Sequence, residues 1–299
     1  MQANSLTDGE TCAANVNDFL IERFLPIRLR GTGQAAIAFA MTNSRLLPLD
    51  AVNNFRDYGG YAAADGRRIR TGRLWRSAQH GEASGSDLDA IHALGITRVV
   101  DLRGPSEREA SPCRRHSNFN AEVWFHPEET AGLALHTDAA DGAFTAAEAK
   151  AAMLRLYDGI AFRENLVPML KVYFTLLGRS AEPSLVHCVA GKDRTGFAVA
   201  MLQEALGVHR DDVMADYLAT NFASRLDERI ASGAFRDMPR YSSFDAETVR
   251  ALWGVEADYL NAAFAAISLR SGSVEDYLER VLGIGPAQRD QLRELYLED

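Results

Sequence analysis

The stretch of sequence that decides the fold is His187-Cys188-Val189-Ala190-Gly191-Lys192-Asp193-Arg194-Thr195-Gly196. Residues 184–187 at its start are typical of a short buried strand, and residues from about 195 to 206 are typical of a helix. A tight loop that leads into a helix points several backbone N–H groups into one concavity, where the helix dipole adds positive potential. The sequence therefore predicts a binding site for a tetrahedral anion between this strand and this helix.

Three side chains of this loop predict chemistry at that anion. Cys188 lies at the base of the loop, where the same dipoles favour the thiolate over the thiol. Arg194 can hold two phosphoryl oxygens through its planar guanidinium, and the hydroxyl of Thr195 can donate a hydrogen bond to the cysteine sulfur. A thiolate below a phosphate site is a nucleophile aimed at phosphorus, so we expect Cys188 to be catalytic rather than a small core residue.

A nucleotide-binding loop, G-x-x-x-x-G-K-[ST], is the pattern most easily confused with this one. Gly191-Lys192 matches its centre, but Val186 stands where the first glycine is needed and Asp193 stands where serine or threonine is needed. Because both positions fail, the sequence predicts no ATP or GTP site here.

Composition limits the class of protein. The chain has 299 residues, of which 47% are hydrophobic, and a formal net charge of −9, which suits a folded protein with a sizeable core. So acidic a chain is poorly suited to nucleic acid or to an anionic membrane surface, and an anionic substrate must be attracted locally. The three cysteines, Cys12, Cys113 and Cys188, show neither disulfide nor metal spacing. We expect no metal, no cofactor and a reducing compartment.

Neither a secretory signal nor an apolar run long enough to span a bilayer is visible. The sequence therefore predicts a cytoplasmic protein without an integral membrane segment, and export without a signal peptide stays compatible with it. The oligomeric state is left open.

The pattern along the chain predicts an N-terminal extension over residues 1–45, helical over about 17–29, and a single domain over 46–299. Asp65-Gly66 predicts a hairpin turn, and further strands are expected at 74–77, 97–102, 121–126 and 184–187. Helices are expected at 86–94, with Ser86 as N-cap, and at 146–158, 162–179, 195–206, 210–220, 222–232, 245–252, 255–270, 274–283 and 286–297. This order predicts an α/β fold with a largely parallel central sheet flanked by helices and a helical C-terminal half. The segment from about 132 to 180 is a candidate helical lid.

The loop resembles the signature of the protein-tyrosine-phosphatase superfamily. With lysine and aspartate inside it, it is most similar to the atypical bacterial group of tyrosine and phosphoinositide phosphatases. The resemblance covers roughly residues 45 to 299 and leaves the first 45 outside. Flanking segments fit the group in order: Asn54-Phe55-Arg56-Asp57-x-Gly59-Gly60, Leu74-Trp75-Arg76-Ser77, Asp101-Leu102-Arg103 with Glu107, and Gly272-Ser273-Val274 with Tyr277-Leu278.

The resemblance implies Cys188 as nucleophile, Arg194 as phosphate clamp and Asp193 as a general acid from within the loop. Asp101 is the competing candidate for the acid, and no metal is implied. Lys192 would contact an additional phosphate or the anionic face of the substrate. The expected substrate-binding residues of the loop are Val189, Ala190, Gly191, Lys192, Thr195 and Gly196.

Several of these residues also have a structural interpretation. Asp101 can anchor Arg103 or Arg56 instead of donating a proton. Arg56 and Asp57 can form an ion pair that fixes their loop, or they can contact the substrate. We expect His187 to order the loop through hydrogen bonds rather than to act as a base.

The sequence thus predicts a cysteine-dependent phosphatase that hydrolyses phosphate monoesters through a cysteinyl-phosphate intermediate. Phosphotyrosine protein is the first expected substrate, with phosphoserine, phosphothreonine and phosphoinositides left open. The alternative is an inactive pseudophosphatase that only holds phosphate, although loss of the cysteine or the arginine is its usual mark and both are present. A rhodanese-type sulfurtransferase also uses a cysteine loop, but it usually lacks the Lys-Asp-Arg-Thr-Gly run.

Overall fold

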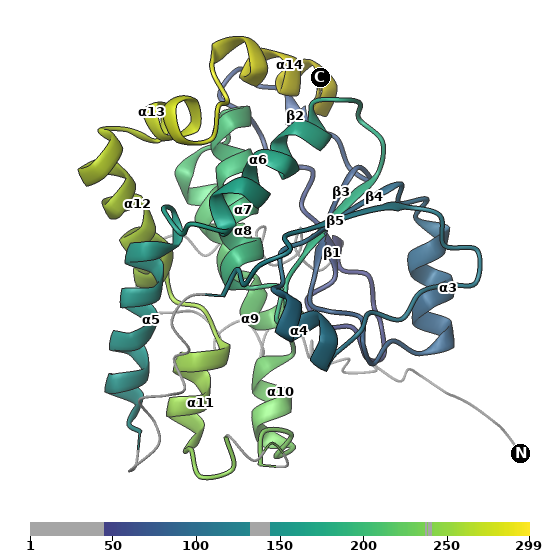
Figure 1. The fold of residues 1–299 in the computed structure, drawn as a ribbon, viewed down its shortest axis with the longest axis vertical. Coiled ribbons are helices and arrows are strands. Elements are labelled where there is room, and N and C mark those ends of the chain that lie inside the picture. The colour runs from purple at the N-terminus through teal and green to yellow at the C-terminus, as the bar shows by residue number, and fades with distance from the viewer. Residues whose placement is uncertain (1–44, 132–143, 237, 239–240) are drawn as a thin grey trace, which may run out of the picture. The chain divides into compact units, whose positions relative to one another are not determined.

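The computed structural model describes residues 45–131, 144–236, 238 and 241–299 (Figure 1). The part of the chain from Arg45 to Asp299 forms one compact unit. The helix expected at about 17–29 and residues 132–143 of the candidate lid lie outside the described residues.

A five-stranded sheet in the order β1-β3-β6-β4-β5 forms the centre of this unit. Four of its strands run parallel, and the edge strand β1 is antiparallel to β3. The strands are β1 Arg56–Asp57, β3 Leu74–Ser77, β4 Arg98–Asp101, β5 Glu122–Phe125 and β6 Ser184–His187. β6 pairs with both β3 and β4, so the catalytic-loop candidate leaves the sheet from its middle strand. Ligands of open α/β sheets bind at this carboxyl edge.

A second sheet has two strands and pairs the C-terminus with an early segment of the chain. β2 (Arg68–Ile69) pairs with β7 (Leu297–Glu298). The sequence pattern predicts a helix over 286–297 and no strand at 297–298, so β7 was not expected. The expected turn at Asp65-Gly66 is present, since Ala63 N–H donates to the Arg67 carbonyl at 2.8 Å and Gly66 has φ +90°.

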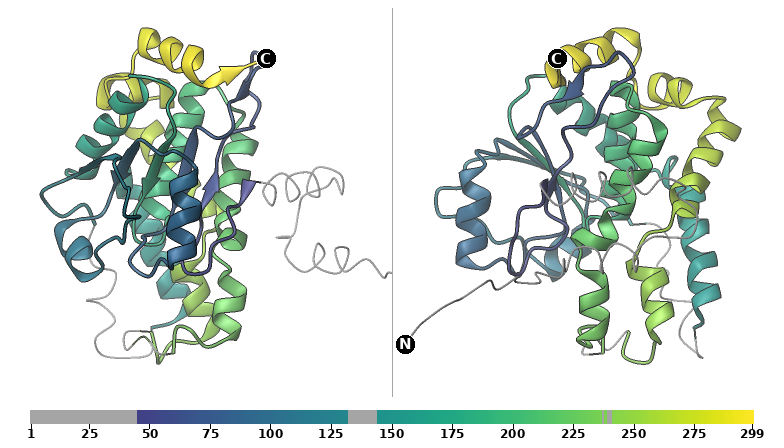
Figure 2. Two further views of the ribbon diagram at one scale, coloured as in Figure 1. Left: turned by 90° about the vertical axis from the view of Figure 1, so that its right-hand side faces the viewer. Right: turned by 180° about the vertical axis from the view of Figure 1, so that it is seen from behind.

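Helices cover both faces of the central sheet, as expected. Figures 1 and 2 show α3 (Gly85–Ala93) on one face and α6, α7 and α8 on the other. α11 packs against both α5 and α10, and the three project together beyond the sheet. The bounds are α4 Pro105–Ala110, α5 Ala146–Ile160, α6 Leu166–Leu177, α7 Asp193–Leu206, α8 Arg210–Leu218, α9 Thr220–Ala223, α10 Leu226–Ala231, α11 Ala246–Trp253, α12 Ala257–Ser271, α13 Val274–Asp276 and α14 Pro286–Tyr296, with a π-helical turn, η1, at Tyr277–Val281.

Three helix predictions need correction. The N-cap of α3 is Ser84, not Ser86, because Asp87 stands three residues after Ser84 and closes a capping box with it. The single helix expected over 222–232 is divided into α9 and α10 at Arg225, which has φ +49°. The helix expected over 274–283 runs without a break from α13 into η1, where the hydrogen bonding changes to the π pattern at Tyr277, and it ends at Val281.

Two cores flank the sheet. The larger lies between the sheet and the C-terminal helices, and α7 runs through it with every residue from Arg194 to Gln203 buried. The smaller lies between the sheet and α3 and contains Phe55, Val99 and Leu185. Trp75 is partly buried against the smaller core, and Trp124 is partly buried against the larger one.

Candidate active site

The loop between β6 and α7 has its carbonyl groups bound on the outside. Gln79 N–H donates to the Val189 carbonyl at 3.0 Å, and Asn54 Nδ2 donates to the carbonyls of Ala190 and Gly191 at 3.2 and 2.7 Å. A trans peptide points its N–H opposite to its C=O. The N–H groups of Ala190, Gly191 and Lys192 therefore point to the concave side, as an anion site requires.

Gly191 makes this turn of the chain feasible. It has φ +68°, in the left-handed region, and a Cβ there would lie 2.3 Å from the carbonyl oxygen of Ser77. Only glycine combines that φ with so close an approach of two backbones. Arg76 Nη2 adds a second hydrogen bond to the Gly191 carbonyl at 2.9 Å, so β3 supports the loop as well.

A buried ion network holds these supports. Arg56 and Arg76 both pair with Asp216 of α8, at 3.5 and 2.6 Å. The expected ion pair between Arg56 and Asp57 is thus wrong. Asp57 accepts hydrogen bonds from the backbone N–H groups of Gly59 and Gly72 instead. Arg56 and Asp57 therefore each hold backbone groups in place next to the loop.

Arg194 is locked in place by a carboxylate. Its two terminal nitrogens each lie 2.6 Å from an oxygen of Glu107, and Nη1 also donates to the Leu102 carbonyl and to Thr130 Oγ1, each at 3.1 Å. Burial disfavours the charged guanidinium, but hydrogen bonds to Glu107 and the attraction of Cys188 and Glu107 outweigh it, and the pKa of Arg194 is raised. The cation is therefore permanent and preorganised.

Asp193 begins α7 and is held through one of its two oxygens. Asp193 Oδ1 accepts hydrogen bonds from Lys192 Nζ and from the Tyr157 hydroxyl, each at 2.9 Å. Tyr157 in turn accepts a hydrogen bond from Tyr217 at 2.6 Å. The Asp193 side chain is 22% exposed, so its second oxygen can meet a substrate.

Lys192 is buried rather than extended into solvent. Besides Asp193, its ammonium binds the carbonyl of Gly254 at 3.2 Å, at the end of α11. These contacts tie the loop to the C-terminal helices. The contact of Lys192 with an additional phosphate stays a prediction, and such a phosphate would compete with the Gly254 carbonyl.

Asp101 lies behind the loop and serves Arg103. Arg103 Nε and Nη2 bind its two oxygens at 2.9 and 2.7 Å, which favours the anchoring interpretation over general acid catalysis. Burial alone would raise the pKa of Asp101, but His187 and Arg103 outweigh it and lower the pKa to about 2.

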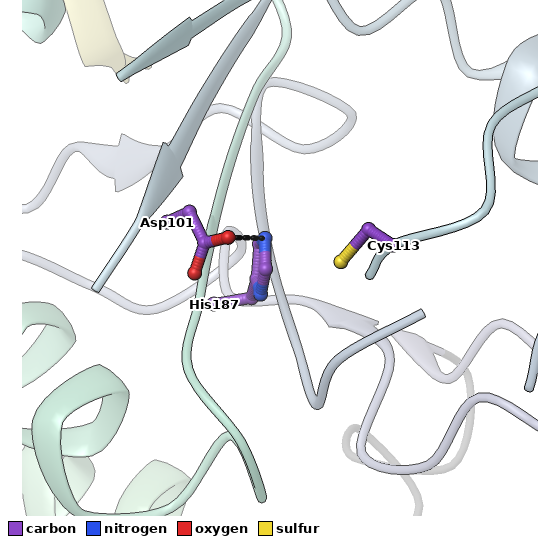
Figure 3. Close-up of side chains that lie close together, drawn as sticks. All are labelled: Asp101, Cys113 and His187. Atoms are coloured by element: carbon purple, nitrogen blue, oxygen red, sulfur yellow. Dashed lines mark ion pairs between the residues drawn. The ribbon is translucent and has the colours of Figure 1, made fainter. Parts of the chain in front are cut away.

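Figure 3 shows Asp101 and Cys113 on either side of His187, and this is the one group of described side chains that could hold a metal ion. Arg103 Nη2 lies between the two candidate ligands, 2.7 Å from Asp101 Oδ2 and 3.0 Å from Cys113 Sγ. A metal would have to displace this guanidinium, so the donor set fits a cation poorly.

His187 is neutral and packed inside the protein. Its Nε2 lies 3.7 Å from Asp101 Oδ2 and its Nδ1 lies 3.4 Å from the Cys188 carbonyl oxygen. Burial lowers the pKa of His187 to about 4. Attraction to Asp101 opposes this shift, and repulsion by Arg103 and Arg115 adds to it. The contacts agree with the expectation that His187 orders the loop.

Cys188 and Thr195 form the base of the loop. Cys188 is 2% exposed, and Thr195 Oγ1 is buried without a hydrogen-bond partner among the described residues. The expected bond from Thr195 to the sulfur is therefore not formed in this structure, but its hydroxyl is unengaged next to the loop.

Five supporting residues had no role assigned from the sequence. Asn54, Arg76 and Glu107 lay within recognised motifs, and the arginine within the expected strand Leu74–Ser77 was a signal that could have been used. Tyr157 and Asp216 come from helices far along the chain, and nothing in their local pattern marks them.

Comparison with known proteins identifies the class. Residues 47–298 match the model of the tyrosine phosphatase family. A protein of Cupriavidus necator that is named as a tyrosine-protein phosphatase is 34% identical over 261 residues, covering 85% of this chain and 90% of the relative. The chain therefore belongs to the tyrosine phosphatase family and is a cysteine-based protein-tyrosine phosphatase.

Two further proteins are similar to it. The triple specificity protein phosphatase PtpB of Mycobacterium tuberculosis is 31% identical over 82% of this chain and 96% of the relative. A tyrosine-protein phosphatase of Nostoc commune is 25% identical over 73% and 72%. Among the described residues, no helix is both long and apolar enough to cross a bilayer.

Proposed function

We propose that the chain hydrolyses phosphotyrosine in proteins through a cysteinyl-phosphate intermediate on Cys188. The observation that carries this proposal is the loop itself, whose outward carbonyls leave N–H groups for a phosphoryl group above Cys188. Arg194, fixed by Glu107, supplies a permanent positive charge at the same loop. Both residues that an inactive pseudophosphatase usually loses are present.

In the first step the Cys188 thiolate attacks phosphorus in line, and the S–P bond forms as the P–O bond to the leaving group breaks. The N–H groups and Arg194 stabilise the charge on the three equatorial oxygens. Asp193 donates its proton to the leaving oxygen through the carboxyl oxygen that Tyr157 and Lys192 do not occupy. In the second step water attacks phosphorus, Asp193 accepts its proton, and the S–P bond breaks.

The depth of Cys188 supports an aryl substrate. At 2% exposure the sulfur lies below the surface, and a tyrosine ring places its phosphate further from the peptide backbone than a serine side chain does. The proposal therefore ranks phosphotyrosine first and leaves phosphoserine, phosphothreonine and phosphoinositides as secondary substrates.

A lid over residues 132–180 stays a proposal. Within that range α6 buries seven residues in the larger core, so α6 belongs to the body of the domain rather than to a movable cover.

The decisive test replaces the nucleophile. Cys188→Ser keeps the volume but lacks a thiolate, so we expect it to fold, to bind inorganic phosphate and to hydrolyse p-nitrophenyl phosphate at under about a hundredth of the wild-type rate. Rapid acid quench and mass spectrometry of the wild-type enzyme should find one phosphoryl group on Cys188. A serine variant that keeps most of its activity, or a phosphoryl group on another residue, would refute the assignment.

A panel of phosphopeptides and soluble phosphoinositides, assayed for released phosphate, tests the substrate class. We expect the largest kcat/KM on phosphotyrosine peptides. Larger values on phosphoinositides would overturn that ranking without touching the mechanism.

A further inference from the structure

A cavity of about 240 Å³ lies on the face of the sheet that α3 covers. Its walls belong to the smaller core and include Leu88, Ile91, Val99, Phe119 and Leu185. The proposed phosphatase mechanism uses none of these residues.

One wall of this cavity carries positive charge without a close partner. Arg115 lines the cavity and is partly buried, with its guanidinium carbon 4.7 Å from the centre of the Phe119 ring. Among the described residues Arg115 has no hydrogen bond or ion pair, and Asp101 and Cys113 attract it only from longer range. Removal from water lowers the pKa of Arg115, which is the cost of a desolvated charge that lacks a counter-ion.

The neighbouring charges cannot satisfy Arg115. Both oxygens of Asp101 are held by Arg103, and Cys113 Sγ lies 3.0 Å from the same guanidinium. Arg114 lines the same cavity and adds a second positive charge. The cavity thus combines apolar walls with an arginine edge, which suits an anion that has an apolar body.

The cavity also touches the back of the catalytic strand. His80 lines it and stacks on His187 with ring centres 5.3 Å apart. His187 directly precedes Cys188 and contacts its carbonyl oxygen. A ligand in the cavity therefore lies one ring away from the residue that positions the loop.

We propose that this cavity binds a small carboxylate with an acyl or aromatic body, its carboxylate on Arg115 and its body between α3 and the sheet. When the carboxylate binds, the stacked rings of His80 and His187 couple its binding to the conformation of the Cys188 loop. This second part rests on the proposed function, whereas binding itself does not.

Octanoate is the probe for the binding part, with octanol as its uncharged match, and inorganic phosphate is kept saturating so that the loop is filled. Calorimetry or ligand-observed NMR should show octanoate bound to the wild-type protein and octanol bound more weakly. Arg115→Gln should weaken octanoate about tenfold because a charge-assisted pair is lost, and Leu88→Phe should weaken both probes by narrowing the cavity. Arg280→Gln, a surface change on η1, is the matched control and should bind as wild type.

Absence of octanoate binding when phosphate is saturating, or binding that is equal in wild type, Arg115→Gln and Leu88→Phe, would overturn the site. If Arg115→Gln does not fold, Leu88→Phe decides. The coupling is read from p-nitrophenyl phosphate turnover, where an octanoate concentration that just saturates the wild type should change kcat in wild type and change it less in Leu88→Phe. An unchanged kcat with octanoate bound would refute the coupling alone, and failure of phosphatase activity itself would leave the binding result standing.

Discussion

Two carboxylates compete for the role of general acid, and their contacts distinguish them. Asp101 gives both oxygens to Arg103 and is 3% exposed, so it has neither a spare oxygen nor access to a leaving group. Asp193 gives one oxygen to Tyr157 and Lys192 and keeps the other for a substrate. A catalytic acid must reach the atom that it protonates, which favours Asp193.

Replacing each carboxylate separates the two. Asp193→Asn should lower kcat by ~10²–10⁴-fold on an alkyl or phenyl phosphate, and far less on p-nitrophenyl phosphate, whose leaving group needs no proton. Asp101→Asn should lose stability without this dependence on the leaving group. A leaving-group dependence in Asp101→Asn and none in Asp193→Asn would exchange the two roles.

Tyr157 is expected to act as a positioning residue for Asp193. Tyr157→Phe removes the hydroxyl that holds Asp193 Oδ1, so kcat on phenyl phosphate should fall several-fold, roughly the effect of one ~1 kcal/mol hydrogen bond, with little change in KM. The matched control is Tyr277→Phe, which removes an equally buried hydroxyl that binds the Ala161 carbonyl. Equal effects of the two variants on kcat would mean that the loss is one of general stability.

At the scale of elements, the β6–loop–α7 unit depends on the backbone of β3. Gly191→Ala would bring a Cβ to 2.3 Å from the Ser77 carbonyl oxygen, in addition to the left-handed φ. Gly283 has a similar φ of +78° with nothing within 4 Å, so Gly283→Ala isolates the cost of conformation, about 1–2 kcal/mol. We expect both variants to lose stability in urea unfolding, but only Gly191→Ala to lose most of its turnover. Full activity in a folded Gly191→Ala variant would contradict the proposed loop geometry.

The elements that the sequence predicted well have strong local signals. β3 and β6 match their expected ranges to the residue, and Gly72 and Pro183 interrupt the pattern just before them. Two-residue strands such as β2 and β7 have no period to detect, and the break at Arg225 depends on packing rather than on a glycine or proline. Local pattern thus located the loop and its flanks but not the short elements that close the fold.

At the scale of the whole molecule, the supports of the loop are long-range. Asp216 of α8 binds Arg56 and Arg76 from the two neighbouring strands β1 and β3, and Lys192 binds the end of α11. Spacing along the chain cannot reveal such ion-pair partners, because many acidic residues elsewhere in the sequence could pair equally well with a buried arginine. One motif was enough to predict roles for Cys188, Asp193 and Arg194, and these roles stay predictions, whereas the residues that hold the three side chains could be found only in the folded structure.

The same buried groups predict how stability depends on pH. His80 and His187 are fully buried and neutral, and burial lowers both of their pKa values, that of His187 to about 4. An unfolded histidine takes up a proton near pH 6.5 while the folded one does not, so stability is complete above that pH and falls as pH decreases toward 4. For His187 alone the loss should reach about 2 kcal/mol at pH 5.

The paired carboxylates act in a lower window. Asp101 has a pKa of about 2 in the folded protein, and the pKa of Asp216 is also lowered, because Arg56 and Arg76 outweigh the effect of burial. Their stabilisation is lost progressively as pH falls below about 5, where unfolded carboxylates begin to take up protons, and most of it is lost below about pH 4. Urea unfolding at pH 7, 6 and 5 therefore isolates the histidines. We expect the free energy of unfolding to fall over this range in wild type and to fall less in His187→Asn. His209→Gln, which changes a histidine that is 74% exposed, should keep the wild-type slope. A wild-type free energy of unfolding that is constant from pH 7 to 5 would show that His187 is charged in the folded protein or solvent-accessible there.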